Sequence, residues 1–426
     1  MENYLYDAHC HIFTLKYAIK EVKSMLHDIL NGTYPWQEPS TKSLYAAWGR
    51  WSDLKLLLRQ LYELIHAAGG SEEENLNFLQ HEAKEAFPEN HLRIIPLMMD
   101  IYYMLAYPLN KDQDLQHVVS LRTLEFDLDD YQNCWNEILD DFAGYLRSNK
   151  PAFSRGISEM SKSVESALQI IEEERSVTET LKLRSGVTAL PVMDGFYETE
   201  GYCYHLNNLM DLEKSRKGEL YPFVAIDPRR KGIIDALLSG SFFRGESRFY
   251  GVKLYPRMGF HPQCKPMDAV YKYCSDNNLP IIFHCGKGGF PPSTTWKYAD
   301  FGNPVHFEPI VKEYPNLKIN FAHFGSSDPT FQWAKTVARL VEENENVYSD
   351  LSCYTNMRDL INKKQLCENR PKLKTRLMFG TDFDVMYFTD RITLSSYYSN
   401  FKAVFYDELE VLMKQNSESF MGLSPK

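Results

Sequence analysis

Short apolar runs of strand length alternate with longer helical patterns through the second half of the chain. The runs are residues 221–227, 250–255, 280–284, 318–323, 347–352 and 377–382. Alternation at this spacing is typical of parallel strands joined by crossover helices. Two earlier runs, near Tyr4 and Ile94, bring the total to eight. Eight such strands predict an α/β fold of the (β/α)8 TIM-barrel class.

The remaining sequence is mostly helical in pattern. Apolar residues recur at helical spacing, for example between Trp135 and Leu146. No sequence repeat with a period of 20–50 residues is evident. We interpret 12–93 and 101–218 as mostly helical insertions within one barrel that spans 1–426. These insertions would cover or flank the barrel, or form a subunit contact in a homo-oligomer.

Composition narrows the class of protein. Hydrophobic residues make up 44% of the chain and charged residues 24%, as in an ordinary soluble globular protein. The 57 acidic residues outnumber the 47 basic ones, which argues against electrostatic binding to nucleic acid. No apolar stretch approaches the roughly 20 residues needed to cross a bilayer. We therefore expect no membrane partner.

The cysteines and the N-terminal residues indicate the compartment. The eight cysteines are scattered without a Cys-X-X-Cys pair, which favours reduced thiols. Glu2 and Asp7 stand where a signal peptide would carry neither. The sequence thus predicts a cytoplasmic protein.

Ionisable residues fall where the apolar runs end. His9 and His11 end the first run, His284 the fifth, His323 the sixth and Asp382 the eighth. In a (β/α)8 barrel these ends meet at one face, where the chemistry lies. Capping or core packing explains any one of these residues, but not all of them at matching ends, because burying them unpaired is costly. Imidazole and carboxylate groups together indicate a divalent metal site.

Four motifs resemble those of the amidohydrolase superfamily, and more closely its branch related to aminocarboxymuconate-semialdehyde decarboxylase. The motifs are Tyr6–His11, Phe283–Gly286, Phe321–Gly325 and Phe379–Asp382, and the tail 416–423 resembles that branch's closing helix. The resemblance covers the first strand and most of 221–423, but neither insertion.

The resemblance implies one divalent metal, held by His9, His11, His284 and Asp382. Zn²⁺ suits this ligand set best, with Mn²⁺, Co²⁺ or Fe²⁺ as alternatives. It also implies a metal-activated water whose proton Asp382 accepts, while His323 hydrogen-bonds the water or polarises the bond under attack. His323 would instead ligate a second metal if two were bound.

Lys253 separates the one-metal and two-metal interpretations. In some members of the superfamily, a carboxylated lysine at the end of strand four bridges two ions. The alternative is a lysine that pairs with a carboxylate such as Asp382. Since the related branch typically lacks the bridge, we expect one metal.

Loops after the strands supply candidate substrate contacts. They carry Arg257 and His261 after strand four, Lys287 and Lys297 after strand five, Tyr354 and Arg358 after strand seven, and Asp384 and Tyr387 just beyond Asp382. These loops are cationic on an acidic protein. We expect a small anionic substrate, a carboxylate, bound by Arg257 or Lys287, with ordinary surface charge as the alternative.

The leading hypothesis is a metal-dependent hydrolase acting on a C–N, ester or lactone bond of a small molecule. The alternative is a lyase, either a non-oxidative decarboxylase of an unsaturated or aromatic acid or a hydratase, because the same groups can protonate a carbon. A phosphoesterase ranks lower, since only Gly286–Gly289 resembles a phosphate cradle. A non-catalytic metal-binding protein ranks last, because the ligand set is complete.

Overall fold

The computed structural model describes residues 3–30, 34, 53–62, 70–115, 128–149, 157–182, 199–290, 296–383 and 392–423. Every strand predicted from the apolar runs is present, including the one near Ile94. The strands are β1 (Tyr4–Cys10), β2 (His91–Pro96), β3 (Phe223–Ala225), β4 (Gly251–Leu254), β5 (Ile281–Phe283), β6 (Ile319–Phe321), β7 (Val347–Asp350) and β8 (Leu377–Met378). All pairings between them are parallel.

The strands form a ring. β3 to β8 follow one another in a six-stranded sheet, and β1 pairs with β2. Parallel bridges from Ile94 and Leu97 join β2 to the chain at β3. On the other side, Ala8 N donates to Phe379 O at 2.9 Å, which places β1 beside the end of β8. These contacts make the fold the predicted (β/α)8 barrel.

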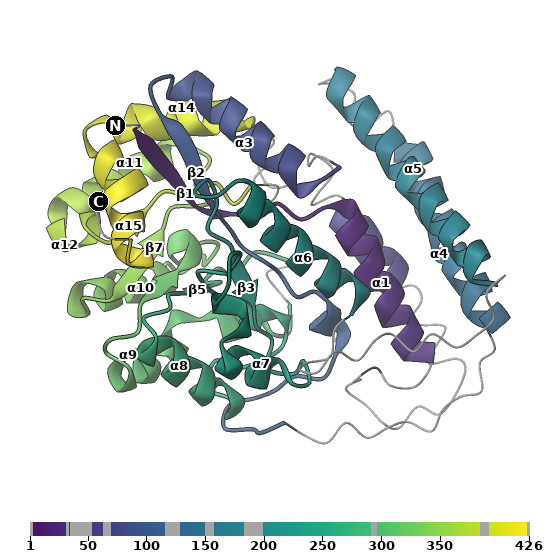
Figure 1. Ribbon diagram of the computed structural model, residues 1–426. Coiled ribbons are helices and arrows are strands. Elements are labelled where there is room, and N and C mark those ends of the chain that lie inside the picture. Colours follow the sequence, from purple (N-terminus) through teal and green to yellow (C-terminus); the bar gives the residue numbers. More distant parts are fainter. Residues whose placement is uncertain are drawn as a thin grey trace.

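Helices follow the strands around the outside of the ring (Figure 1). They are α7 (Ile233–Ser239), α8 (Pro266–Asp276), α9 (Glu308–Glu313), α10 (Gln332–Glu343), α11 (Met357–Asn369), α12 (Pro371–Lys374), α14 (Leu394–Val404) and α15 (Asn416–Met421), with the π-helix η8 (Val411–Gln415). Short 3-10 turns at several strand ends include η3 (Pro256–Met258) and η6 (Ala322–Gly325).

The segments 12–93 and 101–218 contain longer helices. These are α1 (Leu15–Leu30), helical residues 53–62, α3 (Glu72–Ala86), α4 (Leu128–Asn149), α5 (Ile157–Lys182) and α6 (Glu200–Ser215). Residues 106–115 are not helical, although the apolar pattern predicted mostly helical structure for 101–218. Leu109 instead forms a parallel bridge with Phe260, which follows β4. Among the described residues, no helix is long and apolar enough to span a bilayer.

The insertion helices pack on the end of the barrel where the strands finish. Tyr255, Met258 and Phe290, which follow β4 and β5, belong to one apolar cluster with residues of α1 and α4. Figure 1 shows α4 and α5 side by side, outside α1. A buried ion pair adds to this anchorage, because Arg230 after β3 lies 3.6 Å from the carboxylate of Glu21 on α1. The helices therefore cover the face that carries the strand ends.

A substitution at Gly325 tests how closely the residues after β6 approach α10. Its φ is +69°, and an added Cβ would lie 2.7 Å from backbone atoms of Trp333 and Ala334. Gly218 is a matched control, since its φ is +84° but a Cβ there meets nothing within 4 Å. We expect Gly218→Ala to lower the free energy of unfolding by about 1 kcal/mol from backbone strain alone. Gly325→Ala should cost roughly 1–3 kcal/mol more, because of the steric clash.

Urea denaturation of both variants measures this difference. Equal losses in Gly325→Ala and Gly218→Ala would contradict the proposed packing of β6 against α10.

Candidate metal centre

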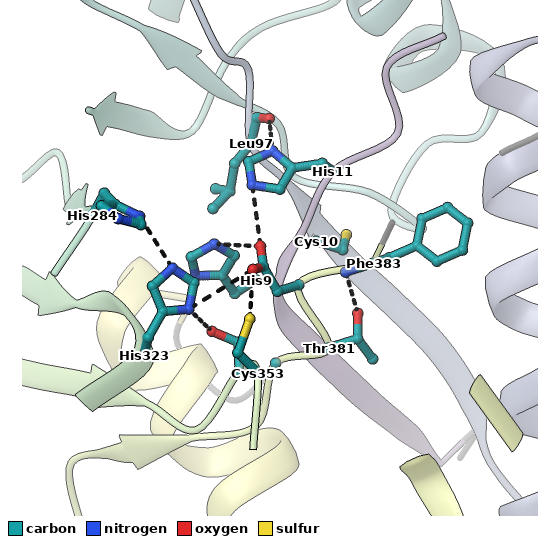
Figure 2. A network of polar contacts seen from close by, with 12 residues as sticks. His9, Cys10, His11, Leu97, His284, His323, Cys353, Thr381 and Phe383 are labelled. Carbon is teal, nitrogen blue, oxygen red and sulfur yellow. Dashed lines mark hydrogen bonds and ion pairs between the residues drawn. The ribbon is translucent and has the colours of Figure 1, made fainter. Parts of the chain in front are cut away.

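His9 and His11 present the same ring nitrogen to the same point. His11 Nδ1 lies 2.8 Å from Leu97 O, and a carbonyl only accepts, so Nδ1 carries the proton. His9 Nδ1 lies 3.0 Å from the Asp350 carboxylate, which fixes its proton in the same way. The Nε2 atoms are left to face Asp382 Oδ1, each at 3.3 Å. Figure 2 shows both imidazoles turned toward this point.

Asp382 reaches the histidines because the chain turns sharply after β8. Its φ is +54°, in the left-handed region that most side chains avoid. Asp7 of β1 holds the preceding residue, accepting hydrogen bonds from Thr381 N at 3.0 Å and Thr381 Oγ1 at 2.6 Å. Asp382 N donates to His9 O at 2.7 Å. Strand β1 thus positions both its own histidines and the aspartate.

His284 and His323 form the second half of the cluster. The carbonyl of Gly288 lies 3.1 Å from His284 Nε2 and only accepts, so the neutral ring has its lone pair on Nδ1. That atom lies 3.2 Å from His323 Nε2. The other nitrogen of His323 lies 2.7 Å from Ser352 Oγ. His323 also has a left-handed backbone, with φ at +61°.

The donor set fits a divalent cation. Two atoms bonded to one ion at about 2.1 Å are roughly 3.0–3.4 Å apart at angles between 90° and 109°. The 3.3 Å separations from Asp382 Oδ1 to the Nε2 atoms of His9 and His11 match that range. Ligand atoms of His9, His323 and Asp382 all lie within 4.8 Å of one another. Among the described residues, that group includes His323, which the sequence interpretation placed outside the ligands of a single metal, but not His11 or His284, which it predicted as ligands.

The carboxyl group of Asp382 is ionised in this setting. Burial alone would raise its pKa, but the imidazoles of His323, His11 and His9 together hold the pKa well below the usual range. A divalent cation bound between these groups would be attracted by the ionised carboxylate and by the facing imidazole nitrogens.

Three of the four histidines are neutral near pH 7. Burial is the largest cause in each case: it lowers the pKa of His11, lowers that of His323 to about 4, and takes that of His284 well below its usual value. His9 differs, because the Asp350 and Asp382 carboxylates outweigh burial and the charge of Lys253 and raise its pKa. Neutral imidazoles bind metal without first losing a proton.

Lys253 lies on the metal-facing side of His9. Its Nζ is 3.4 Å from His9 Nε2, and burial lowers its pKa to about 8 against the opposing pull of Asp382 and Asp350. Within the described part of the chain, no ion pair joins Lys253 to Asp382 at 4.0 Å or less. The ammonium group therefore faces the metal-binding edge of His9.

A small cavity adjoins the cluster. Its volume is about 20 Å³, room for about one water molecule. Tyr255 stacks on His284, with 4.2 Å between ring centres. The lining combines four of the predicted site residues with apolar side chains: His11, His284, His323, Asp382, Phe13, Met99, Tyr255, Gly289 and Phe290.

The predicted substrate contacts divide into two groups. Arg257 is buried and donates to Lys287 O at 2.7 Å. Its charge contributes to lowering the pKa of His284, after the larger effects of burial, His323 and Lys253. Lys287 itself forms an ion pair with Asp328 at 3.0 Å. Of the two cations, Arg257 is thus the buried one and Lys287 the partly exposed one.

None of the described candidates for substrate contacts, Arg257 and Lys287 included, lines the small cavity. His261 accepts from Gln263 N at 3.0 Å and packs against His306. Tyr354 lies under the ammonium group of Lys363. Lys297 lies over the ring of Tyr298. Arg358 is exposed on α11, and Asp384 and Tyr387 are outside the described residues.

Sequence reasoning missed three residues that touch the cluster. Asp350 ends β7, Ser352 and Cys353 follow it, and Cys353 Sγ donates to Asp382 Oδ2 at 2.7 Å. The available signal was the position of Asp350 within the run 347–352, near the end of the seventh strand.

Comparison with known proteins identifies the family of the central segment. Residues 189–390 match the family described as amidohydrolase, which confirms the resemblance noted from the motifs. No curated protein matches the chain significantly.

Several solved structures share parts of the fold. An uncharacterised TIM-barrel protein from Bordetella bronchiseptica is 18% identical, over 51% of this chain and 72% of that one, with a TM-score of 0.39. A probable 2-pyrone-4,6-dicarboxylic acid hydrolase from Acinetobacter baumannii, with citric acid bound, is 15% identical, over 59% and 88%, with a TM-score of 0.40.

A third similar structure is a 5-carboxyvanillate decarboxylase from Novosphingobium aromaticivorans, with bound manganese and 3-methoxy-4-hydroxy-5-nitrobenzoic acid. It is 12% identical, over 99% of this chain and 97% of that one, with a TM-score of 0.49.

Metal content tests the donor set. We expect the purified protein to retain one equivalent of a divalent metal per chain by inductively coupled plasma mass spectrometry. His11→Ala should lose most of it, because one of the facing Nε2 atoms is removed. His91→Ala is the control, since His91 is an exposed histidine at the start of β2. Two equivalents in the unaltered protein, or full retention by His11→Ala, would contradict a single centre at this position.

Proposed function

We propose that this chain, whose central segment matches the amidohydrolase family, is a hydrolase that cleaves a C–N, ester or lactone bond of a small carboxylate-bearing molecule. The main support is the placement of an ionised, buried carboxylate, Asp382, beside a water-sized cavity and four imidazoles. The family is metal-dependent, and His9, His11, His284 and Asp382 are the ligands we propose, with His323 adjacent. Zn²⁺ is our candidate ion because this mixture of nitrogen and oxygen donors suits it.

The side chains provide the acid and base steps of such a reaction. A divalent ion held there would supply Lewis acidity and lower the pKa of a water molecule toward neutrality. Asp382 accepts the proton from the attacking water and later passes it to the leaving group. His323, whose Nδ1 contacts Ser352 Oγ and whose Nε2 lies beside His284, is the residue we assign to polarising the bond under attack.

The surroundings favour a particular substrate shape. Phe13, Met99 and Phe290 line the cavity, so they would contact an apolar part of the molecule. Arg257 is the cation we assign to the substrate carboxylate, because it is buried and donates to Lys287 O, two residues before the cavity-lining Gly289. His261 and Tyr354 remain candidates for the outer part of the substrate.

Isotope labelling distinguishes the two reaction classes. We expect screening of small lactones, esters and amides with a free carboxylate to find a substrate that gains one ¹⁸O from H₂¹⁸O in the product, without release of carbon dioxide. His323→Asn should lower kcat by roughly 10²–10⁴-fold through loss of the polarising imidazole, while His91→Asn leaves it unchanged. Carbon dioxide release, with solvent deuterium appearing on a product carbon, would show a decarboxylase instead.

Steady-state kinetics test the choice of cation. For a carboxylate-bearing substrate, we expect Arg257→Met to raise KM at least tenfold, because a charge-assisted hydrogen bond is lost. Lys287→Met should raise KM much less, since Lys287 already pairs with Asp328. The amide of the substrate's carboxylate is the control and should show little difference between the unaltered enzyme and Arg257→Met. An unchanged KM in Arg257→Met would exclude this role.

A further inference from the structure

Asp350 lies at the end of β7, fully buried behind the candidate metal centre. Five donors reach its two oxygens. Oδ2 accepts from His9 Nδ1 at 3.0 Å and Asn320 Nδ2 at 2.6 Å. Oδ1 accepts from His323 N at 3.0 Å, Ser352 N at 3.1 Å and the Ser352 hydroxyl. A carboxylate offers about four lone-pair positions, so this group is saturated.

The contact with His9 decides which ring nitrogen faces the cluster. Because a carboxylate only accepts, His9 Nδ1 must carry the proton. Nε2 is then the atom presented to Asp382, at 3.3 Å. A carboxylate behind a metal-binding histidine typically fixes the ring and makes it a better ligand.

A second chain of contacts runs from the same carboxylate to His323. Asp350 Oδ1 accepts from His323 N, which helps to hold that residue in its left-handed backbone conformation. The Ser352 hydroxyl donates to Oδ1, and its oxygen lies 2.7 Å from His323 Nδ1. Ser352 therefore transmits the orientation of Asp350 to the second imidazole, whose Nε2 then faces His284.

We propose that Asp350 is a positioning residue that sets the ring orientation of two histidines from different strands, His9 directly and His323 through Ser352. It touches neither substrate nor cation. Only the expected effect of Asp350 on metal affinity rests on the proposed metal-dependent function. The effect on the imidazoles is a property of the protein alone.

Asp350→Asn is the decisive substitution because it keeps the shape and removes one acceptor oxygen. The new amide group would point two N–H donors at a position already surrounded by donors. We expect the downfield Nδ1–H proton resonance of His9, followed by NMR with ¹⁵N-labelled histidine, to shift or disappear. Zn²⁺ affinity, from chelator competition on the full chain, should fall 10–100-fold.

Glu72→Gln is the matched control. Glu72 and His205 form a similar buried carboxylate–imidazole pair at 3.2 Å, and neither residue lines the cavity beside the metal cluster. We expect this variant to change the His205 resonance and to leave Zn²⁺ affinity within twofold of the unaltered protein. Equal weakening in Glu72→Gln and Asp350→Asn would overturn the proposal, because the effect would then reflect general destabilisation.

Ser352→Ala tests the chain of contacts from Asp350 through Ser352 to His323, and it remains informative if Asp350→Asn does not fold. It removes one hydroxyl and leaves the His9–Asp350 contact in place. We expect the His323 ring resonances to shift while the His9 Nδ1–H signal is retained. Unchanged His323 resonances, or a His9 ring without a hydrogen-bonded Nδ1–H in the unaltered protein, would overturn the proposal. Either result is independent of whether the enzyme is a hydrolase or a lyase.

Discussion

The contact between β1 and the residues that follow β8 is the one on which the rest of the site depends. Asp7 and Thr381 are 374 positions apart in the sequence, yet they share two hydrogen bonds. Closing the ring there places His9 and His11 beside Asp382. A barrel that failed to close at this point would keep most of its core, but it would lose the pairing of imidazoles with a carboxylate.

Hydrogen bonds to the imidazole nitrogens that point away from the cluster decide which nitrogens face into it. Leu97 O, Gly288 O and the Asp350 carboxylate hold the outward nitrogens of His11, His284 and His9. Each of these acceptors turns a lone pair inward, where Asp382 is ionised. Burying such groups is costly unless something satisfies them. A divalent cation beside Asp382 Oδ1 would satisfy that carboxylate together with the facing Nε2 atoms of His9 and His11, and this is the physical reason for regarding the cluster as a metal centre.

Much of this arrangement follows from sequence pattern because barrel geometry is periodic. Apolar runs located all eight strands, and the rule that strand ends share one face predicted that His284 and Asp382 would meet the N-terminal pair. Pair-specific contacts could not be predicted. Nothing in the sequence indicates that Lys287 has Asp328 as a partner, that His261 packs on His306, or that residues 106–115 leave the helical pattern to pair beside β4. Asp350 was within reach of the same rule, but its role depends on a hydrogen bond to His9, 341 positions away.

The central claim is that one divalent cation is held where the N-terminal histidines meet the aspartate after β8. Anomalous diffraction from crystals of the Zn²⁺-loaded protein, recorded on both sides of the zinc absorption edge, tests it most directly. The account predicts a single strong anomalous peak within bonding distance of His9 Nε2, His11 Nε2 and Asp382. A peak elsewhere in the molecule, or none at this position, would contradict it.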